Sequence, residues 1–347
     1  MPNLSIAKPS GVLRSGWSAT VGDYAIAGGW ALGGEALVVA DAAGGVSVLD
    51  GKSGDAIWSH DKTHDGGCLA AAVHPIGTKF ATAGQDGRVC IWRANDPQAE
   101  HALSVGTDWV EHVAWSPDGR RLAVTCSRQA IVYEADGSEL WRSEDHPSTI
   151  SAIAWASSDE LATACYGRVT FTDISTNEPR QKLEWQGSLV SMVLSADGDI
   201  VACGSQDNSV HFWRRSSGED SMMHGYPSKP SSLAFDDSGQ LLATSGGQAV
   251  TVWSFTGEGP EGTEPGVLKH HARTVSALAF ARRGRTLASA CRGGRVAVWS
   301  LSSDGSGQEV GAARLLDAVA ELYWRPDGRA LAALDARGGV HVWRASS

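Results

Sequence analysis

The 347-residue sequence lacks features that define several large classes of protein. No run of apolar residues approaches the roughly 18 needed to cross a bilayer, and residues 1–16 lack the unbroken apolar stretch of a signal peptide. Lys and Arg number 29 against 39 Asp and Glu, so a net charge of −10 offers no positive field to nucleic acid or to an anionic membrane. These absences predict a cytoplasmic protein that binds neither nucleic acid nor membranes.

Motifs of common enzymes are also missing. The sequence contains no GxxxxGK[ST] phosphate loop, no HExxH zinc motif and no GxSxG nucleophile elbow, and no helix is predicted after its Gly-Gly pairs. Its six cysteines are widely spaced without a CxxC pair, which is typical of reduced thiols rather than of a disulfide framework. A non-enzymatic binding protein is therefore favoured over an enzyme with a site at a channel mouth.

An internal repeat is what the sequence does contain. Eight segments share an apolar-x-apolar ending, five of them closed by Trp, at separations of 39 to 46 residues. The endings are VSVL (46–49), VCIW (89–92), AIVY (130–133), VTFT (169–172), VHFW (210–213), VTVW (250–253), VAVW (296–299) and VHVW (340–343). Short apolar runs with period-two alternation precede each ending, and no window has a helical period. Four short strands in about 40 residues predict one blade of a β-propeller.

The repeat resembles the WD-repeat β-propeller family, in which Trp-Asp or a related dipeptide closes each unit. Its fullest copy here is His64, Thr82, Asp86 and Trp92, which match the family's hydrogen-bonded set of a loop His, a Ser or Thr, a turn Asp and an indole. The resemblance therefore assigns these four residues a structural role, not a catalytic one. The Asp of the dipeptide is missing, since other residues follow the tryptophans: Arg93, Arg214, Ser254, Ser300 and Arg344.

The predicted fold is all-β, a single eight-bladed WD-repeat propeller over residues 1–347. The expected blades are 19–60, 61–105, 106–144, 145–186, 187–225, 226–271, 272–317 and 318–347, with residues 10–18 as the outer strand of the last blade. That strand is expected because the last unit ends after its third strand, and closing the ring protects the free sheet edges. Seven blades with residues 20–50 as an N-terminal cap is the alternative, because Leu49 replaces Trp in the first unit.

The resemblance also implies where a partner binds. In the family, the connections between blades and the turns between second and third strands form one rim of the channel. We expect partner-contacting residues there: Gln85, Trp109, Glu111, Arg128, Tyr166, Gln206, Lys229, Arg273 and Arg292. Trp109 stands out because it lies in a loop beside charged residues, as an aromatic contact residue does.

A metal-handling protein remains a second hypothesis. Cys126 and Cys165 occupy one ring position in neighbouring units, with Cys291 at the same position further on, and thiolates that converge there would bind zinc. His60, His64 and Cys68 form another group before the second blade. Against this, small residues are needed where blades crowd together, and Cys packs as a small hydrophobe.

The preferred prediction is a monomeric scaffold that binds a protein partner and needs no cofactor. Its richness in Ala, Gly and Arg is typical of a bacterial source with GC-rich DNA.

Overall fold

The structure is a computed structural model that describes residues 8–257 and 259–346. The described part of the chain contains β-strands, one 3-10 turn, η1 (Leu32–Gly34), and no α-helix. No helix there is long and apolar enough to span a membrane. Contacts divide the chain into two compact units: Thr20–Met192, which we call the internal unit, and Met1–Ala19 with Val193–Ser347, which we call the terminal unit.

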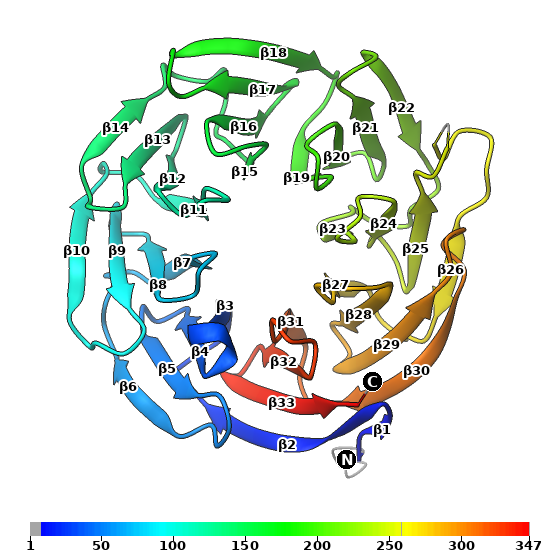
Figure 1. Ribbon diagram of the computed structural model, residues 1–347, viewed down its shortest axis with the longest axis horizontal. Helices are drawn as coiled ribbons and strands as arrows, with labels where there is room; N and C mark the ends of the chain where they lie inside the picture. The colour runs from blue at the N-terminus through cyan, green and yellow to red at the C-terminus, as the bar shows by residue number, and fades with distance from the viewer. Residues whose placement is uncertain (1–7, 258, 347) are drawn as a thin grey trace. The chain divides into compact units, whose positions relative to one another are not determined.

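The internal unit contains four four-stranded antiparallel sheets, which we number blades 1 to 4 (Figure 1). Blade 1 consists of β3 (Ala25–Ala31), β4 (Ala36–Asp41), β5 (Val46–Asp50) and β6 (Ala56–His60). Blade 2 consists of β7 (Cys68–Val73), β8 (Lys79–Gly84), β9 (Arg88–Arg93) and β10 (Ala99–Ser104). Blade 3 consists of β11 (Val110–Trp115), β12 (Arg121–Cys126), β13 (Gln129–Glu134) and β14 (Glu139–Arg142). Blade 4 consists of β15 (Ala152–Trp155), β16 (Glu160–Cys165), β17 (Arg168–Asp173) and β18 (Glu178–Glu184).

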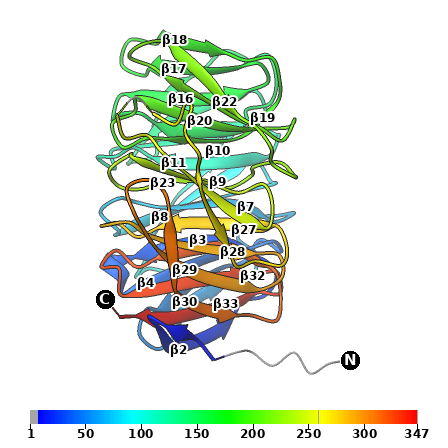
Figure 2. The same cartoon turned by 90° about the vertical axis from the view of Figure 1, so that its right-hand side faces the viewer.

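The terminal unit contains blades 6 and 7, blade 8 except Thr20 at the end of β2, and blade 5 except the first residues of its first strand (Figure 2). Blade 5 consists of β19 (Leu189–Leu194), β20 (Ile200–Ser205), β21 (Val210–Arg214) and β22 (Glu219–Met223). Blade 6 consists of β23 (Leu233–Phe235), β24 (Leu241–Thr244), β25 (Ala249–Ser254) and β26 (Gly266–Lys269). Blade 7 consists of β27 (Val275–Phe280), β28 (Thr286–Cys291), β29 (Arg295–Leu301), β30 (Gly307–Arg314) and β1 (Ser10–Gly11). Blade 8 consists of β31 (Val319–Trp324), β32 (Ala330–Asp335), β33 (Gly339–Ala345) and β2 (Leu13–Thr20).

The predicted all-β fold with eight blades is confirmed, and the alternative of seven blades with a cap is wrong. Residues 25–60 form a complete four-stranded sheet although Leu49 stands in the place of Trp. Leu49 is 3% exposed and pairs with Leu37 and Ala56 in the sheet. An aliphatic side chain at this position is therefore compatible with the strand.

The N-terminal strand completes the last blade, as predicted, but over a shifted range. Strand β2 lies beside β33, the last strand of the chain, as the fourth strand of its sheet. Ser10 and Gly11 instead pair with Ala312 and Gly311 of β30 in blade 7. The backbone of Val12 joins the two blades, because its N–H donates to Val310 O and its carbonyl accepts from Ser346 N.

The hydrophobic core of each unit lies between adjoining blades. One cluster contains Phe80 and Trp92 of blade 2 together with Val48 and Trp58 of blade 1. Equivalent clusters join blades 2 and 3, 3 and 4, 5 and 6, 6 and 7, and 7 and 8. A single blade is too thin to bury its faces alone, so its stability depends on its neighbours.

Tryptophans at the ends of first strands fix adjoining blades together. The indole N–H of Trp115 donates to Ala72 O in the preceding blade at 3.1 Å, that of Trp155 to Ala114 O at 3.0 Å, and that of Trp324 to Ala279 O at 3.0 Å. Each tryptophan thereby joins its blade to the preceding one and satisfies its indole donor.

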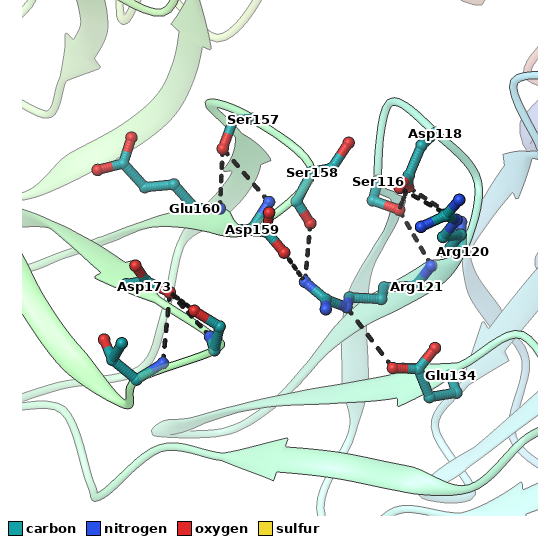
Figure 3. A network of polar contacts seen from close by, with 12 residues as sticks. Ser116, Asp118, Arg120, Arg121, Glu134, Ser157, Ser158, Asp159, Glu160 and Asp173 are labelled. Atoms are coloured by element: carbon teal, nitrogen blue, oxygen red, sulfur yellow. Dashed lines mark hydrogen bonds and ion pairs between the residues drawn. The ribbon is translucent and has the colours of Figure 1, made fainter.

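An arginine joins blades 3 and 4 at the end that carries the turns between their first and second strands (Figure 3). The guanidinium of Arg121 donates to Ser158 O at 3.0 Å and to Asp159 Oδ1 at 2.5 Å, and it lies 3.6 Å from Glu134 Oε1. Its backbone N–H donates to Ser116 Oγ. These contacts join the β11–β12 and β15–β16 turns of the two blades.

Candidate partner-binding surface

The four residues of the repeat's fullest copy form one hydrogen-bonded series in blade 2. His64 Nδ1 lies 3.0 Å from Asp86 Oδ1, His64 Nε2 lies 3.0 Å from Thr82 Oγ1, and Trp92 Nε1 donates to Thr82 Oγ1 at 3.1 Å. Burial lowers the pKa of His64 in spite of the bond to Asp86, so the imidazole is neutral at pH 7. With Nδ1–H donating to Asp86, every polar atom of the series has a partner.

Asp86 holds the chain around this series rather than offering a free carboxylate. Its oxygens also accept from the backbone N–H groups of Asp65 and Arg88. Burial works to raise the pKa of Asp86, but the bonds from His64 and the two backbone groups outweigh it, and the net pKa is lowered. An ionised, fully engaged carboxylate of this kind is suited to fixing a turn, not to acid-base chemistry.

The structure reveals related series that sequence reasoning missed. His271 Nε2 lies 2.7 Å from Ser289 Oγ, which also accepts from Trp299, and His146 Nε2 lies 2.9 Å from Thr163 Oγ1. In blade 6, the hydroxyl of Tyr226 takes the place of the imidazole, bonding Thr244 and accepting from Trp253. The available signal was the spacing, since His or Tyr precedes its Ser or Thr by 17 or 18 residues in each case, as His64 precedes Thr82 by 18.

The predicted metal ligands point to separate partners. His64 belongs to the series above, His60 Nε2 contacts Pro97 O, and the Cys68 thiol donates to Gly45 O at 3.5 Å. Cys126 donates to Asp108 O and Cys165 to Tyr166 O, whereas Cys291 accepts from the N–H of Gly293. Among the described residues, no group of three or more His, Cys, Asp or Glu is placed to hold a metal ion.

Burial also keeps several of the thiols protonated in the metal-free protein, whereas a metal is bound by the thiolate. All six cysteines are free and buried. Burial raises the pKa of Cys68 to about 12, and it raises the pKa values of Cys126 and Cys165 as well. These side chains therefore remain protonated, consistent with packing between blades.

The predicted contact residues occur at one end of the blades in each unit. Because strands alternate in direction, the turn between second and third strands lies at the same end as the connection into the first strand. In the internal unit these segments carry Gln85, Trp109, Arg128 and Tyr166, and Glu111 lies at the start of β11 at the same end. In the terminal unit they carry Gln206, Lys229, Arg273 and Arg292, all of them exposed.

Two aromatic side chains dominate this end of the internal unit. Trp109 is 52% exposed and Tyr166 is 60% exposed, whereas Gln85 and Glu111 are half-buried. Tyr24, which the sequence did not single out, precedes β3 at the same end and is 40% exposed. We call Tyr24, Trp109, Arg128 and Tyr166 the aromatic surface.

Hydrogen bonds between loops hold the aromatic surface in place. The Cys126 thiol donates to Asp108 O beside Trp109, and the N–H of His146 donates to Arg128 O. The N–H of Tyr166 donates to Ser148 Oγ at 2.9 Å. The loop that carries Trp109 is also bonded to the β8–β9 turn, because the N–H of Val105 donates to Gly87 O. Gly87 has a φ of +70°, and a Cβ at this position would lie 2.1 Å from Gly106 O, so only glycine fits.

Comparison with known proteins supports the repeat and the fold. The family model of the WD domain, G-beta repeat, matches residues 54–93, 99–134, 177–214 and 262–300. The chain is similar to the crystal structure of the computationally designed Ika8 protein, with a TM-score of 0.81 at 20% identity over 94% of this chain and 98% of that one. A chain in the crystal structure of a mitotic checkpoint complex gives a TM-score of 0.66 at 20% identity, over 79% of this chain and 86% of that one. At these identities the likeness shows a shared fold.

Relatives among curated proteins match over part of the chain. An intraflagellar transport protein 80 homolog of Mus musculus is 26% identical over 42% of this chain, and Protein HIR1 of Mycosarcoma maydis is 29% identical over 43% of it. Protein transport protein SEC13 of Kluyveromyces lactis is 30% identical over 27% of this chain and 36% of its own length. The chain spans only 19% and 18% of the first two relatives.

Proposed function

Because this chain is a WD-repeat β-propeller protein, we propose that it is a non-enzymatic scaffold that binds a protein partner through the aromatic surface. Support comes from relatives whose names describe transport and from a similar chain found in a checkpoint complex. The blades supply a rigid frame, and the loops at their ends supply specificity.

The observation that carries this proposal is the exposure of Trp109 and Tyr166 on loops fixed by hydrogen bonds. Trp and Tyr are the side chains most enriched among residues that dominate protein interfaces, since they bury large area at little cost in conformational entropy. Arg128 lies between them along the chain, with Nε donating to His146 O at 2.6 Å, which holds its stem in one orientation. An arginine held at the same end of the unit can contribute charge to a partner interface.

The experiment is capture of partners from the source organism on immobilised protein, followed by mass spectrometry and measurement of the affinity of the recovered partner. The W109A/Y166A double variant should bind that partner at least about tenfold more weakly. Ile76 is the matched control, because it is 72% exposed in the β7–β8 turn at the other end of blade 2. If I76A weakens binding and W109A/Y166A does not, the partner uses the other end and the proposal is wrong.

We also propose that the protein works as a monomer without a cofactor, in a bacterial cytoplasm. Its six free, buried cysteines support a reducing compartment, since secreted proteins of this size commonly pair theirs. Size-exclusion chromatography with light scattering tests the oligomeric state, and a dimer mass would contradict it.

A further inference from the structure

Blade 1 contains a hollow at the place where its sequence departs from the repeat. Leu49 stands where five other blades have Trp, and a cavity of about 490 Å³ lies beside its strand. The residues lining it run from Thr20 to Asp61, all within the internal unit. Volumes in this range are typical of sites for small ligands.

A buried carboxylate lines this hollow. Asp41 is 4% exposed, and its Oδ1 accepts from the N–H groups of Ala43 at 3.0 Å and Gly45 at 2.8 Å. Its Oδ2 accepts no hydrogen bond from the residues that the structure describes, although Asp41 is part of the cavity wall. Oδ2 is not sealed from solvent, so a cationic donor in the hollow would reach it and form a charge-assisted hydrogen bond.

Blade 8 shows what an occupied version of the same position looks like. Asp335 Oδ1 accepts from Arg337 N and Gly339 N, in the same pattern as Asp41. Its Oδ2 lies 3.2 Å from His341 Nε2, and His341 Nδ1 lies 3.0 Å from Ser18 Oγ. In blade 8, therefore, an imidazole from the third strand satisfies the second oxygen.

In blade 1 that imidazole is absent. His341 pairs with Ala333, two residues before Asp335, and Ser47 pairs with Val39, two residues before Asp41. Ser47 thus occupies the position of His341, with Ser59 opposite it on β6. A hydroxymethyl group replaces an imidazole, and Leu49 replaces the neighbouring indole, which accounts for the empty space beside Asp41.

The charge around the hollow selects a cation. Its wall includes the carboxylates of Asp41 and Asp61 together with His60, and it includes no Lys or Arg. We propose that the hollow binds a small organic cation whose ammonium or guanidinium group donates to Asp41 Oδ2, with Ser47 and Ser59 beside it. A metal ion does not fit this arrangement, because the described residues offer no group of three ligands and the space is far larger than an ion needs.

Isothermal titration calorimetry on the full chain tests this proposal, with n-pentylamine and agmatine as probes and 1-pentanol as the uncharged control. Wild-type protein should bind both cations saturably and should not bind the alcohol. D41N keeps an oxygen for the two backbone N–H groups but removes the charge, and S47H restores the imidazole of blade 8. Each variant should weaken binding at least about tenfold, with the thermal unfolding midpoint confirming that it is folded.

The control variants separate this site from its surroundings. D335N alters the same position of blade 8 and should bind the cations as wild type does. W109A/Y166A should also bind them normally, so a failed cation-site proposal can be told apart from a failed proposal of partner binding at the aromatic surface. The proposal is overturned if neither cation binds, if D41N and S47H bind normally, or if 1-pentanol binds equally well. It is likewise overturned if a blocked Gly-Lys-Gly peptide binds where the free amines do not, because the occupant is then a partner's side chain.

Discussion

At the scale of single residues, the hydroxyl of Thr82 holds two buried groups at once. It bonds His64 Nε2 and accepts from Trp92 Nε1, and Thr82 itself is 0% exposed. Replacing it by Val keeps the shape but leaves both partners without a hydrogen bond in the interior. We expect T82V to lower the free energy of unfolding by about 2 kcal/mol, as measured by urea denaturation.

The matched control is T78V, because Thr78 is exposed in the β7–β8 turn and uses only its backbone carbonyl, which accepts from Ala94 N. Its effect should stay within about 0.5 kcal/mol. Equal losses from the two variants would show that the hydroxyl of Thr82 has no special role.

His271 gives the protein a pH-dependent stability. Burial, and then the nearby charges of His270 and Arg295, lower its pKa from 6.5 to about 3. Between these values the unfolded chain binds a proton that the folded chain does not, so stability is full above pH 6.5 and is lost as the pH falls towards 3. This one group should reduce the free energy of unfolding by about 2 kcal/mol between pH 7 and pH 5.

The variant H271Q isolates this contribution, since its amide can still bond Ser289 but does not titrate. Urea unfolding at pH 7 and pH 5 should show a smaller difference for H271Q than for wild type. If H271Q loses as much stability between pH 7 and pH 5 as wild type does, His271 is not the group responsible. The candidates are then the other histidines whose pKa values burial lowers: His64, His112, His146 and His211.

Single residues also show how far sequence reasoning reaches. The series around His64 was predictable because all four residue types are present at the spacing of the family pattern. The series in blade 6 departs from that pattern in residue type, because Tyr226 takes the place of the histidine, and only its spacing of 18 residues before Thr244 signalled it. Exposure was equally hidden, since Tyr24 differs from buried aromatics only through the fold around it.

At the scale of elements, strand β2 is anchored by one side chain. Leu13 is 0% exposed within the cluster between blades 7 and 8, which includes Trp343 and Leu331. L13A should lower the free energy of unfolding by about 3 kcal/mol in urea, because it removes buried methyl groups and leaves a cavity. S15A, on the same strand but exposed, should change it by less than about 0.5 kcal/mol. If S15A lowers it as much as L13A does, burial of the Leu13 side chain is not what anchors the strand.

The sequence indicated β2 because the last unit ends after its third strand, but it contained no sign of β1. Ser10 and Gly11 carry no apolar alternation, and their pairing with β30 depends on where Val12 leads the backbone. Backbone pairing of this kind is not encoded in a pattern of apolar side chains.

At the scale of the whole molecule, periodicity determines the number of blades, whereas side-chain direction determines the sites. Eight endings about 40 residues apart gave eight sheets, since each unit can bury its faces only against its neighbours. The proximity of His60, His64 and Cys68 in sequence did not translate into a cluster, because their side chains face Pro97, Thr82 and Gly45 respectively. The hollow beside Asp41 was not predicted from the sequence either, because it depends on where the side chains of Ser47 and Leu49 on β5 point.

The reactivity of the six thiols tests both their burial in the folded protein and the hypothesis of a metal site. All are buried and free, and burial raises the pKa of Cys90 to about 11 and that of Cys68 to about 12, so thiolate is scarce at neutral pH. Native protein purified without a His tag should react slowly with DTNB and release less than about one-tenth of an atom of zinc per chain, because the cysteines share no ligand geometry. After denaturation without reductant, six thiols should react. Stoichiometric zinc would establish a metal site that packing alone does not explain, and fewer than six thiols would place the protein in an oxidising compartment.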